Sequence, residues 1–133
     1  MIVLDASALV ELLLNTRSGQ AVARRIADPG LGVHVPHLAD IEVAQVLRRL
    51  AGTGELKASE ASTAIEDLRA LDLQRHAHEP LLERVWELRQ NLSAYDAVYV
   101  ALAEVLDTVV LTCDSRLARA PRVANRVALV VAD

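Results

Sequence analysis

Four acidic residues stand at positions where a carboxylate could take part in chemistry as well as in solvation. Asp5 and Asp114 each follow a short apolar stretch, while Glu42 and Asp96 lie in segments with the apolar spacing of helices. Two carboxylates about 4 Å apart repel each other by about 4 kcal/mol at an effective dielectric constant of about 20. A cluster of these four side chains would therefore need a cation, and Mg²⁺ or Mn²⁺ suits oxygen ligands of this kind.

Each acid also has an ordinary structural explanation. Asp5 and Asp114 precede helical segments and could cap them, and Ser93 with Asp96 fits the capping-box pattern of a helix start. Glu42 could be a solvated helix residue. Capping does not exclude chemistry, because a helix N-terminus holds an anionic side chain in place. Taken singly, each acid is open to both explanations.

Short apolar segments alternate with helical ones along the chain, which predicts an α/β fold with helices on both faces of a parallel sheet. Strands are expected at residues 2–4, 33–35, 71–73, 108–112 and 127–131, the third of them weak. Helices are expected at residues 8–14, 16 or 18 to 27, 37–50, 57 or 59 to 70, 80–90, 93–106, and after residue 114. The elements therefore predict a three-layer α/β/α sandwich.

The order of the strands decides whether the acids can meet. The first strand is apolar throughout, so we expect it at the centre of the sheet, in the order 3-2-1-4-5. Asp5 follows this strand and Asp114 follows the fourth, and parallel strands end at the same edge of a sheet. Open α/β sheets bind their ligands at that edge. The predicted order places both acids at a ligand site.

Composition narrows the class of protein. A chain of 133 residues is expected to form one domain, 1–133. It is 53% hydrophobic but only 2% aromatic, so its core must be aliphatic. The net charge of −4 gives no overall attraction to nucleic acid. No apolar run spans a bilayer and no charged leader precedes the first strand, so we expect a cytoplasmic protein without membrane contact. The four histidines lack the cysteine partners and spacing of a zinc site.

The segments around the four acids carry a resemblance that covers nearly the whole chain. They read MIVLDASALVE around Asp5, VPHLADIEVAQVLRR around Glu42, LSAYDAVYVALAEVL around Asp96 and VVLTCDSRLARA around Asp114. In order and context these segments resemble the PIN-domain nucleases. They are most similar to the VapC toxins of the bacterial VapBC toxin–antitoxin pairs.

The resemblance implies an activity and a site. A PIN-like fold would bring Asp5, Glu42, Asp96 and Asp114 into one pocket that holds Mg²⁺ or Mn²⁺, and the reaction would be the hydrolysis of RNA phosphodiester bonds by an endoribonuclease. Such a cation makes water a usable nucleophile near neutral pH and offsets charge on the reacting phosphate. The hydroxyls of Ser7 and Thr112 match positions that support this pocket in the family.

The resemblance also implies partners and has limits. A VapB-type antitoxin would neutralise the activity, and the chain would form a homodimer. Some relatives carry a further acid where this chain has Ser115 and Arg116. Asp40 is not the expected ligand, because the family's acid lies within the helix, where Glu42 stands. Residues 52–80 carry no signature, so the RNA substrate is not specified.

Two other classes of protein fit parts of the pattern. A phosphoreceiver-like signalling domain also places acids at strand ends, but it needs a lysine near the last strands, and Lys57 lies in the middle of the chain. A PIN-like module that binds RNA or protein without cleavage is the second alternative. The presence of all four acids argues for catalysis. A titration with Mn²⁺ that depends on Asp5 and Asp96 together would distinguish the two.

Overall fold

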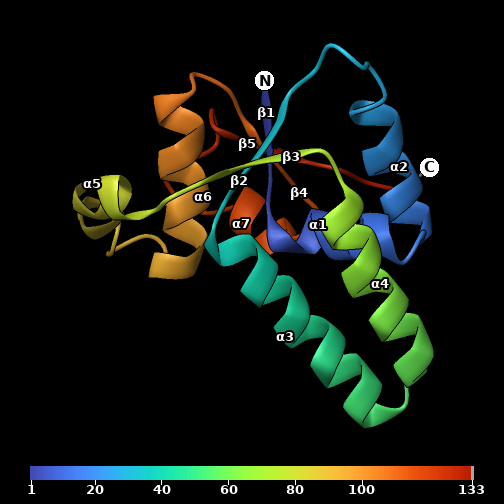
Figure 1. Cartoon of the computed structure of the whole chain (residues 1–133). Coiled ribbons are helices and arrows are strands. Elements are labelled where there is room, and N and C mark those ends of the chain that lie inside the picture. Colours follow the sequence, from blue (N-terminus) through green and yellow to red (C-terminus); the bar gives the residue numbers. More distant parts are fainter. Residues whose placement is uncertain (133) are drawn as a thin grey trace.

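The computed structural model describes residues 1–132, and a parallel β-sheet lies at the centre of this part of the chain (Figure 1). Its strands are β1 (Ile2–Leu4), β2 (Val33–Pro36), β3 (Leu73–His76), β4 (Val110–Thr112) and β5 (Val127–Leu129). Every neighbouring pair is parallel, and the order is β3-β2-β1-β4-β5. The predicted order 3-2-1-4-5 is confirmed, with β1 at the centre and β4 beside it.

Helices cover both faces of this sheet. They are α1 (Ala6–Leu13), α2 (Arg17–Arg25), α3 (Leu38–Thr53), α4 (Ala58–Ala70), α5 (Leu82–Glu87), α6 (Ala94–Val105) and α7 (Ser115–Ala118), with a 3-10 turn at Glu79–Leu81. Figure 1 shows α5 and α6 on one side of the sheet and α1, α2 and α4 on the other. The predicted three-layer α/β/α architecture is therefore confirmed.

Two packing arrangements set the shape of the molecule. α6 packs on β1, β2 and β4, so it crosses the middle of the sheet. α3 packs against α1 and α4, and Figure 1 shows α3 and α4 running side by side beyond the sheet. No helix within residues 1–132 has the length and apolar character needed to cross a membrane.

The core is aliphatic, as the composition requires. Val3 and Leu4 of β1 and Val110 and Leu111 of β4 are at most 1% exposed, so both central strands are covered on both faces. This is why these strands read as uninterrupted apolar runs rather than as an alternating pattern. Tyr99 of α6 is the one large aromatic side chain among the fully buried residues of the described chain. Its hydroxyl reaches the site described below.

Element boundaries differ from the sequence prediction where capping or edge position decides them. α1 begins at Ala6 rather than at residue 8, because Asp5 caps it directly. β4 begins at Val110 rather than at residue 108, because Asp107 adopts a left-handed conformation with φ 52° after α6. β5 ends at Leu129 rather than at residue 131.

The predictions of the third strand and of the fifth helix were wrong in extent. β3 spans 73–76, not 71–73, because the Leu71 N–H still bonds the Asp67 carbonyl at the end of α4. β3 is an edge strand with exposed Gln74 and Arg75, so it lacks the apolar signal of the inner strands. The segment predicted as one helix over 80–90 begins as a 3-10 turn, and α5 ends at Glu87.

Candidate functional site

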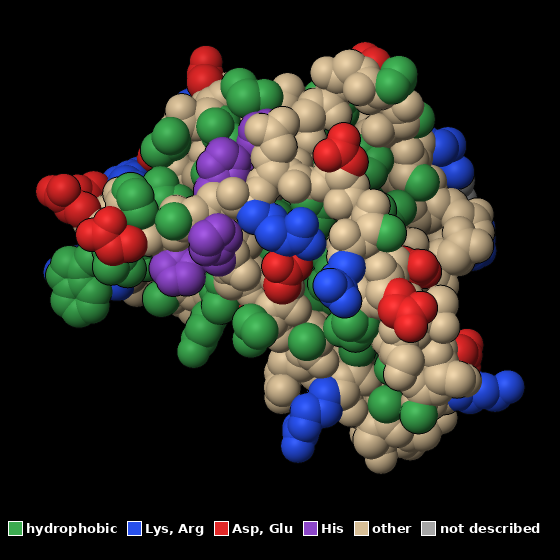
Figure 2. Space-filling view, in the orientation of Figure 1, with side chains coloured by type: hydrophobic (Ala, Val, Ile, Leu, Met, Phe, Trp, Pro, Cys, Tyr) green, Lys and Arg blue, Asp and Glu red, His purple; other side chains and the backbone are tan. Residues whose placement is uncertain are grey.

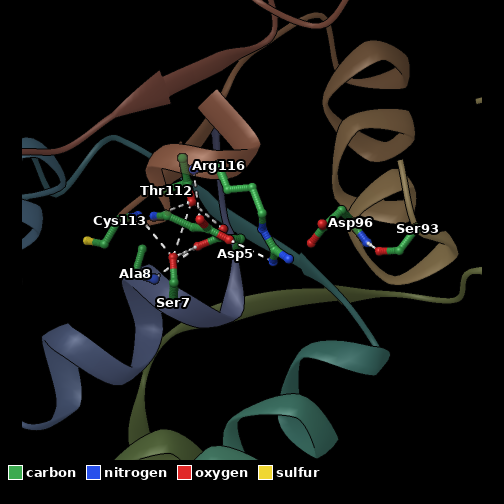
Figure 3. Close-up of polar contacts among 9 residues, drawn as sticks. Asp5, Ser7, Ala8, Ser93, Asp96, Thr112, Cys113 and Arg116 are labelled. Carbon is green, nitrogen blue, oxygen red and sulfur yellow. Dashed lines mark hydrogen bonds and ion pairs between the residues drawn. The ribbon is translucent and has the colours of Figure 1, made fainter. Parts of the chain in front are cut away.

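Asp5 is buried at the junction of β1 and α1. Its side chain is the N-cap of α1, where Oδ1 accepts the Ala8 N–H at 2.9 Å. The Ser7 hydroxyl donates to the same oxygen at 2.7 Å, and the Thr112 hydroxyl donates to Oδ2 at 2.5 Å. Only 5% of Asp5 is exposed (Figure 3). The capping explanation of this acid is therefore correct, and it accounts for only one of three hydrogen bonds.

The two hydroxyls tie the ends of β1 and β4 together. Thr112 is the last residue of β4, and its oxygen accepts the Asp114 N–H at 2.9 Å. Ser7 accepts the Cys113 N–H at 2.9 Å, and the two hydroxyl oxygens lie 3.2 Å apart. Asp5 and Asp114 thus lie at one edge of the sheet and are linked through the Thr112 hydroxyl.

Asp114 sits in the turn between β4 and α7. Its Oδ1 accepts the Arg116 N–H at 2.9 Å and so caps this short helix. Its Oδ2 lies 3.2 Å from the Arg116 guanidinium. In Figure 3 that guanidinium reaches across the front of the site toward Asp96. Asp114 is therefore both a cap and one half of an ion pair at the mouth of the site.

Glu42 and Asp96 approach from two further helices. Asp96 lies in the first turn of α6, and its N–H bonds the hydroxyl of the N-cap residue Ser93 at 3.1 Å. Glu42 lies in α3, and its Oε1 accepts the Tyr99 hydroxyl at 2.6 Å. Tyr99 follows Asp96 by three residues on α6, so one face of that helix carries an acid and the group that holds a second acid.

Burial and mutual repulsion raise the pKa of three of these carboxyl groups. Burial is the largest cause for Asp5, Glu42 and Asp96. The charge on Asp96 further raises the pKa of Asp5 and Glu42, and Asp114 raises that of Asp96. Arg116 opposes this at Asp96 and lowers its pKa. Asp96 therefore interacts electrostatically with each of the other three acids.

A pocket of about 380 Å³ opens beside these groups. Glu42 and Asp96 line one part of it and Arg116 another. The remaining lining comes from Asn91, Leu92, Ser93, Tyr95, Leu117 and Ala120. The pocket therefore combines carboxylates and a guanidinium in a space that can admit part of a nucleotide chain.

The donor set suits a hard divalent cation. It consists of carboxylate and hydroxyl oxygens, which Mg²⁺ and Mn²⁺ prefer, and the raised pKa values mark charge that such a cation would compensate. Within residues 1–132, however, no three acidic, His or Cys side chains are close enough together to form a metal-binding group. Each of Asp5, Glu42 and Asp114 instead holds a partner within the protein. Asp5 and Glu42 keep lone pairs that could accept a cation beside these hydrogen bonds. Cation binding at Asp114 would displace the Arg116 guanidinium.

Two residues of the site were not identified from the sequence. Tyr99 was not named as a site residue, although its spacing of three from Asp96 places both on one side of a helix. Arg116 was noted as standing in place of an acid, and its contact with Asp114 was not foreseen. An exposed side chain of this length leaves no periodic signal in a sequence.

The fold and site can now be compared with known proteins. The PIN domain family model matches residues 2–123. A VapC ribonuclease of Mycobacterium bovis is 49% identical over 117 residues, which cover 88% of each chain. The ribonuclease VapC1 of Mycobacterium tuberculosis is 40% identical over 129 residues, 96% of each chain. The chain belongs to the PIN-domain family, among the VapC ribonucleases.

Solved structures agree on the fold at much lower identity. A protein from Pyrobaculum aerophilum aligns with a TM-score of 0.72 at 22% identity, covering 97% of this chain and 88% of its own. VapC20 of M. tuberculosis, described as a sarcin–ricin-loop-cleaving toxin, aligns with a TM-score of 0.67 at 16% identity, covering 89% and 93%. At these identities the likeness concerns the fold alone.

Proposed function

We propose that this protein is the toxin of a toxin–antitoxin pair and acts as a divalent-metal-dependent endoribonuclease. The observation that carries the proposal is that Asp5, Glu42 and Asp114 all lie close enough to Asp96 to interact with it electrostatically, in a chain of the VapC family. Acids that repel one another in a partly buried pocket are costly to the fold, which argues for a role beyond packing.

Each acid is assigned a role toward the cation. Asp5, Asp96 and Asp114 would hold Mg²⁺ or Mn²⁺, with Glu42 as a fourth ligand. When bound, this cation would lower the pKa of water and offset charge on the reacting phosphate. Ser7 and Thr112 fix the direction of the Asp5 carboxylate, and Tyr99 fixes that of Glu42. We further propose that the substrate is RNA and that the protein acts in the cytoplasm.

An apolar groove beside the acids supports the antitoxin proposal. It is lined by Ala6, Leu38, Ile41, Gln45, Val46 and Tyr95, together with Glu42 of the site. Ile41 is 69% exposed and Tyr95 is 61% exposed, so the groove carries apolar surface that water meets directly. An antitoxin segment could lay hydrophobic side chains here and direct a basic side chain toward the neighbouring carboxylates.

A second apolar area supports the homodimer. Trp86 and Leu82 of α5 are 67% and 55% exposed, and Leu82 borders a pocket that also contains Val85, Ala94 and Val98. Figure 2 shows hydrophobic side chains beside acidic ones at the end of the molecule where α5 lies. A monomer rarely leaves large apolar side chains so close together in contact with water. We propose this area, the α5 face, as the surface where two copies meet.

Cleavage of RNA tests the function directly. Purified protein is incubated with a structured RNA in Mn²⁺, in EDTA, and in EDTA with Mn²⁺ then restored in excess. Internal cleavage that stops in EDTA and returns with Mn²⁺ is expected. Cleavage that persists in EDTA would refute the metal dependence, and intact RNA under all three conditions would favour the non-catalytic binding module.

A further inference from the structure

Arg116 is the cationic residue in the lining of the acidic pocket. Its side chain is 80% exposed, while Asp114, with which it pairs at 3.2 Å, is 28% exposed. The guanidinium also lies near enough to Asp96 to lower the pKa of that acid. Figure 3 shows it between the Asp5 network and Asp96. One flexible cation thus stands at the entrance to a site made of carboxylates.

The contact with Asp114 is weakly held. An ion pair with one member this exposed is largely screened by solvent. The guanidinium is attracted by the negative charge of the acids, and any cation bound to Asp114 and Asp96 would offset that charge. The guanidinium could then leave Asp114 while its helix, α7, stays in place. The side chain would still lie on the rim of the pocket.

A positive group at this position would offset the repulsion between the carboxylates and an RNA phosphate. The chain has a net charge of −4, and the pocket presents carboxylates to any phosphodiester that enters it. Guanidinium is suited to phosphate because its planar fork donates two parallel hydrogen bonds. On the basis of the ribonuclease function proposed above, we propose that Arg116 binds a backbone phosphate of the RNA strand in this pocket. Arg116 is thereby a substrate-positioning residue.

A simpler role would make Arg116 only a counter-charge for the acids. The two roles differ in what a substitution changes. A counter-charge controls the affinity of the acids for Mn²⁺ and leaves RNA affinity unchanged. A phosphate ligand controls RNA affinity, its dependence on salt, and KM more than kcat.

The test compares Arg116→Ala and Arg116→Lys with Arg119→Ala. Arg119 is an exposed neighbour outside the pocket lining, and its removal changes the net charge by the same amount. A fluorescein-labelled 12-nucleotide single-stranded RNA is titrated by anisotropy at several NaCl concentrations in Ca²⁺, a hard cation that carboxylates also bind, so that the acids are occupied as the proposal requires. KM and kcat are measured in Mn²⁺, and Mn²⁺ affinity is measured without RNA.

The proposal predicts that Arg116→Ala weakens RNA binding and raises KM about tenfold, the size expected for one charge-assisted contact. The slope of log affinity against log salt should fall by about 0.7, the value for one phosphate of a single strand. Arg116→Lys should retain part of the affinity, and Arg119→Ala should change it less than threefold. Because Arg116 is exposed, thermal melts of all variants should match the wild type.

Three results would overturn the proposal. Equal losses of RNA affinity in Arg116→Ala and Arg119→Ala would show that RNA binding depends only on the overall charge. An altered Mn²⁺ affinity with unchanged RNA binding would leave Arg116 as a counter-charge. Wild-type protein that neither binds nor cuts RNA would remove the ribonuclease function and this inference with it, which separates that failure from the first two.

Discussion

The carboxyl group of Asp96 shows how the site opposes the stability of the fold. Its pKa is raised above the ordinary value of 3.8, with burial as the largest cause. The folded protein therefore binds this proton more tightly than the unfolded chain does. The stabilising contribution is fully present below pH 3.8 and is lost as the pH rises through the raised pKa.

This linkage predicts the effect of Asp96→Asn in EDTA. The variant lacks the titrating charge. Its free energy of unfolding should therefore increase relative to that of the wild type as the pH rises from about 4 to about 7. Urea unfolding at several pH values measures the difference. Asp67→Asn, which removes one exposed acid of α4, is the control for the loss of a single charge. If the difference in free energy of unfolding between the wild type and Asp96→Asn does not change with pH, the proposed burial of this charge is contradicted.

The residues of the site differ in how far they could be located from the sequence alone. Asp5 and Asp114 could be placed because each follows an apolar strand, and the register of parallel strands brings their positions together. Arg116 and Tyr99 could not be placed. Their roles depend on side-chain reach and on the packing of α6 against α3, which no local pattern encodes. The displacement of Arg116 from Asp114 that a cation would require is equally invisible in the sequence.

At the scale of elements, the backbones of α1 and α2 approach each other so closely that only a glycine fits between them. A Cβ at Gly19 of α2 would lie 1.8 Å from the backbone carbonyl oxygen of Glu11 on α1. Backbone cannot move aside as the end of a flexible side chain can. α1 carries Asp5 at its N-terminus, so a shift of this helix would also disturb the carboxylate.

Gly19→Ala is therefore expected to lower the free energy of unfolding by about 1–3 kcal/mol, the usual cost of overpacking. Gly52→Ala on α3 is the matched control, because a Cβ there meets nothing within 4 Å. It should stabilise the protein by about 0.5–1 kcal/mol through helix propensity. Urea unfolding measures both, and a Gly19→Ala protein as stable as the wild type would show that the two helices can separate without cost.

The sheet order was predictable because it depends on burial, and burial leaves a strong signal. β1 and β4 are covered on both faces and read as apolar runs, so their neighbouring central positions follow from the sequence. β3 lies at the edge with a polar surface, and its position was predicted two residues too early. Local apolar content identifies inner strands, while the limits of an edge strand are set by its pairing with β2.

At the scale of the whole molecule, the α5 face is the surface that we propose for the association of two copies. If two copies meet there, Trp86→Asp places a charge in an apolar interface and should shift the protein toward monomer. Arg24→Asp is not a suitable control, because that residue has contacts of its own. Val105→Asp is suitable, since Val105 is 69% exposed at the end of α6 and does not line the pocket at α5.

Light scattering at micromolar concentration measures the mass of each protein. We expect a dimer for the wild type and for Val105→Asp, and a monomer for Trp86→Asp. A wild-type monomer would remove the homodimer proposal. A Trp86→Asp dimer would leave the dimer in place and move its interface to another surface.

The central claim is that four acids from different elements form one cation site, and Mn²⁺ binding tests it most directly. Calorimetric titrations compare wild type, Asp5→Asn, Asp96→Asn, the double variant, and Asp67→Asn as control. Because both acids would hold the same ion, each single variant should lose most of the affinity, and the double variant should lose little more. Asp67→Asn should bind as the wild type does. Asp5→Asn and Asp96→Asn proteins that keep wild-type Mn²⁺ affinity would contradict the account.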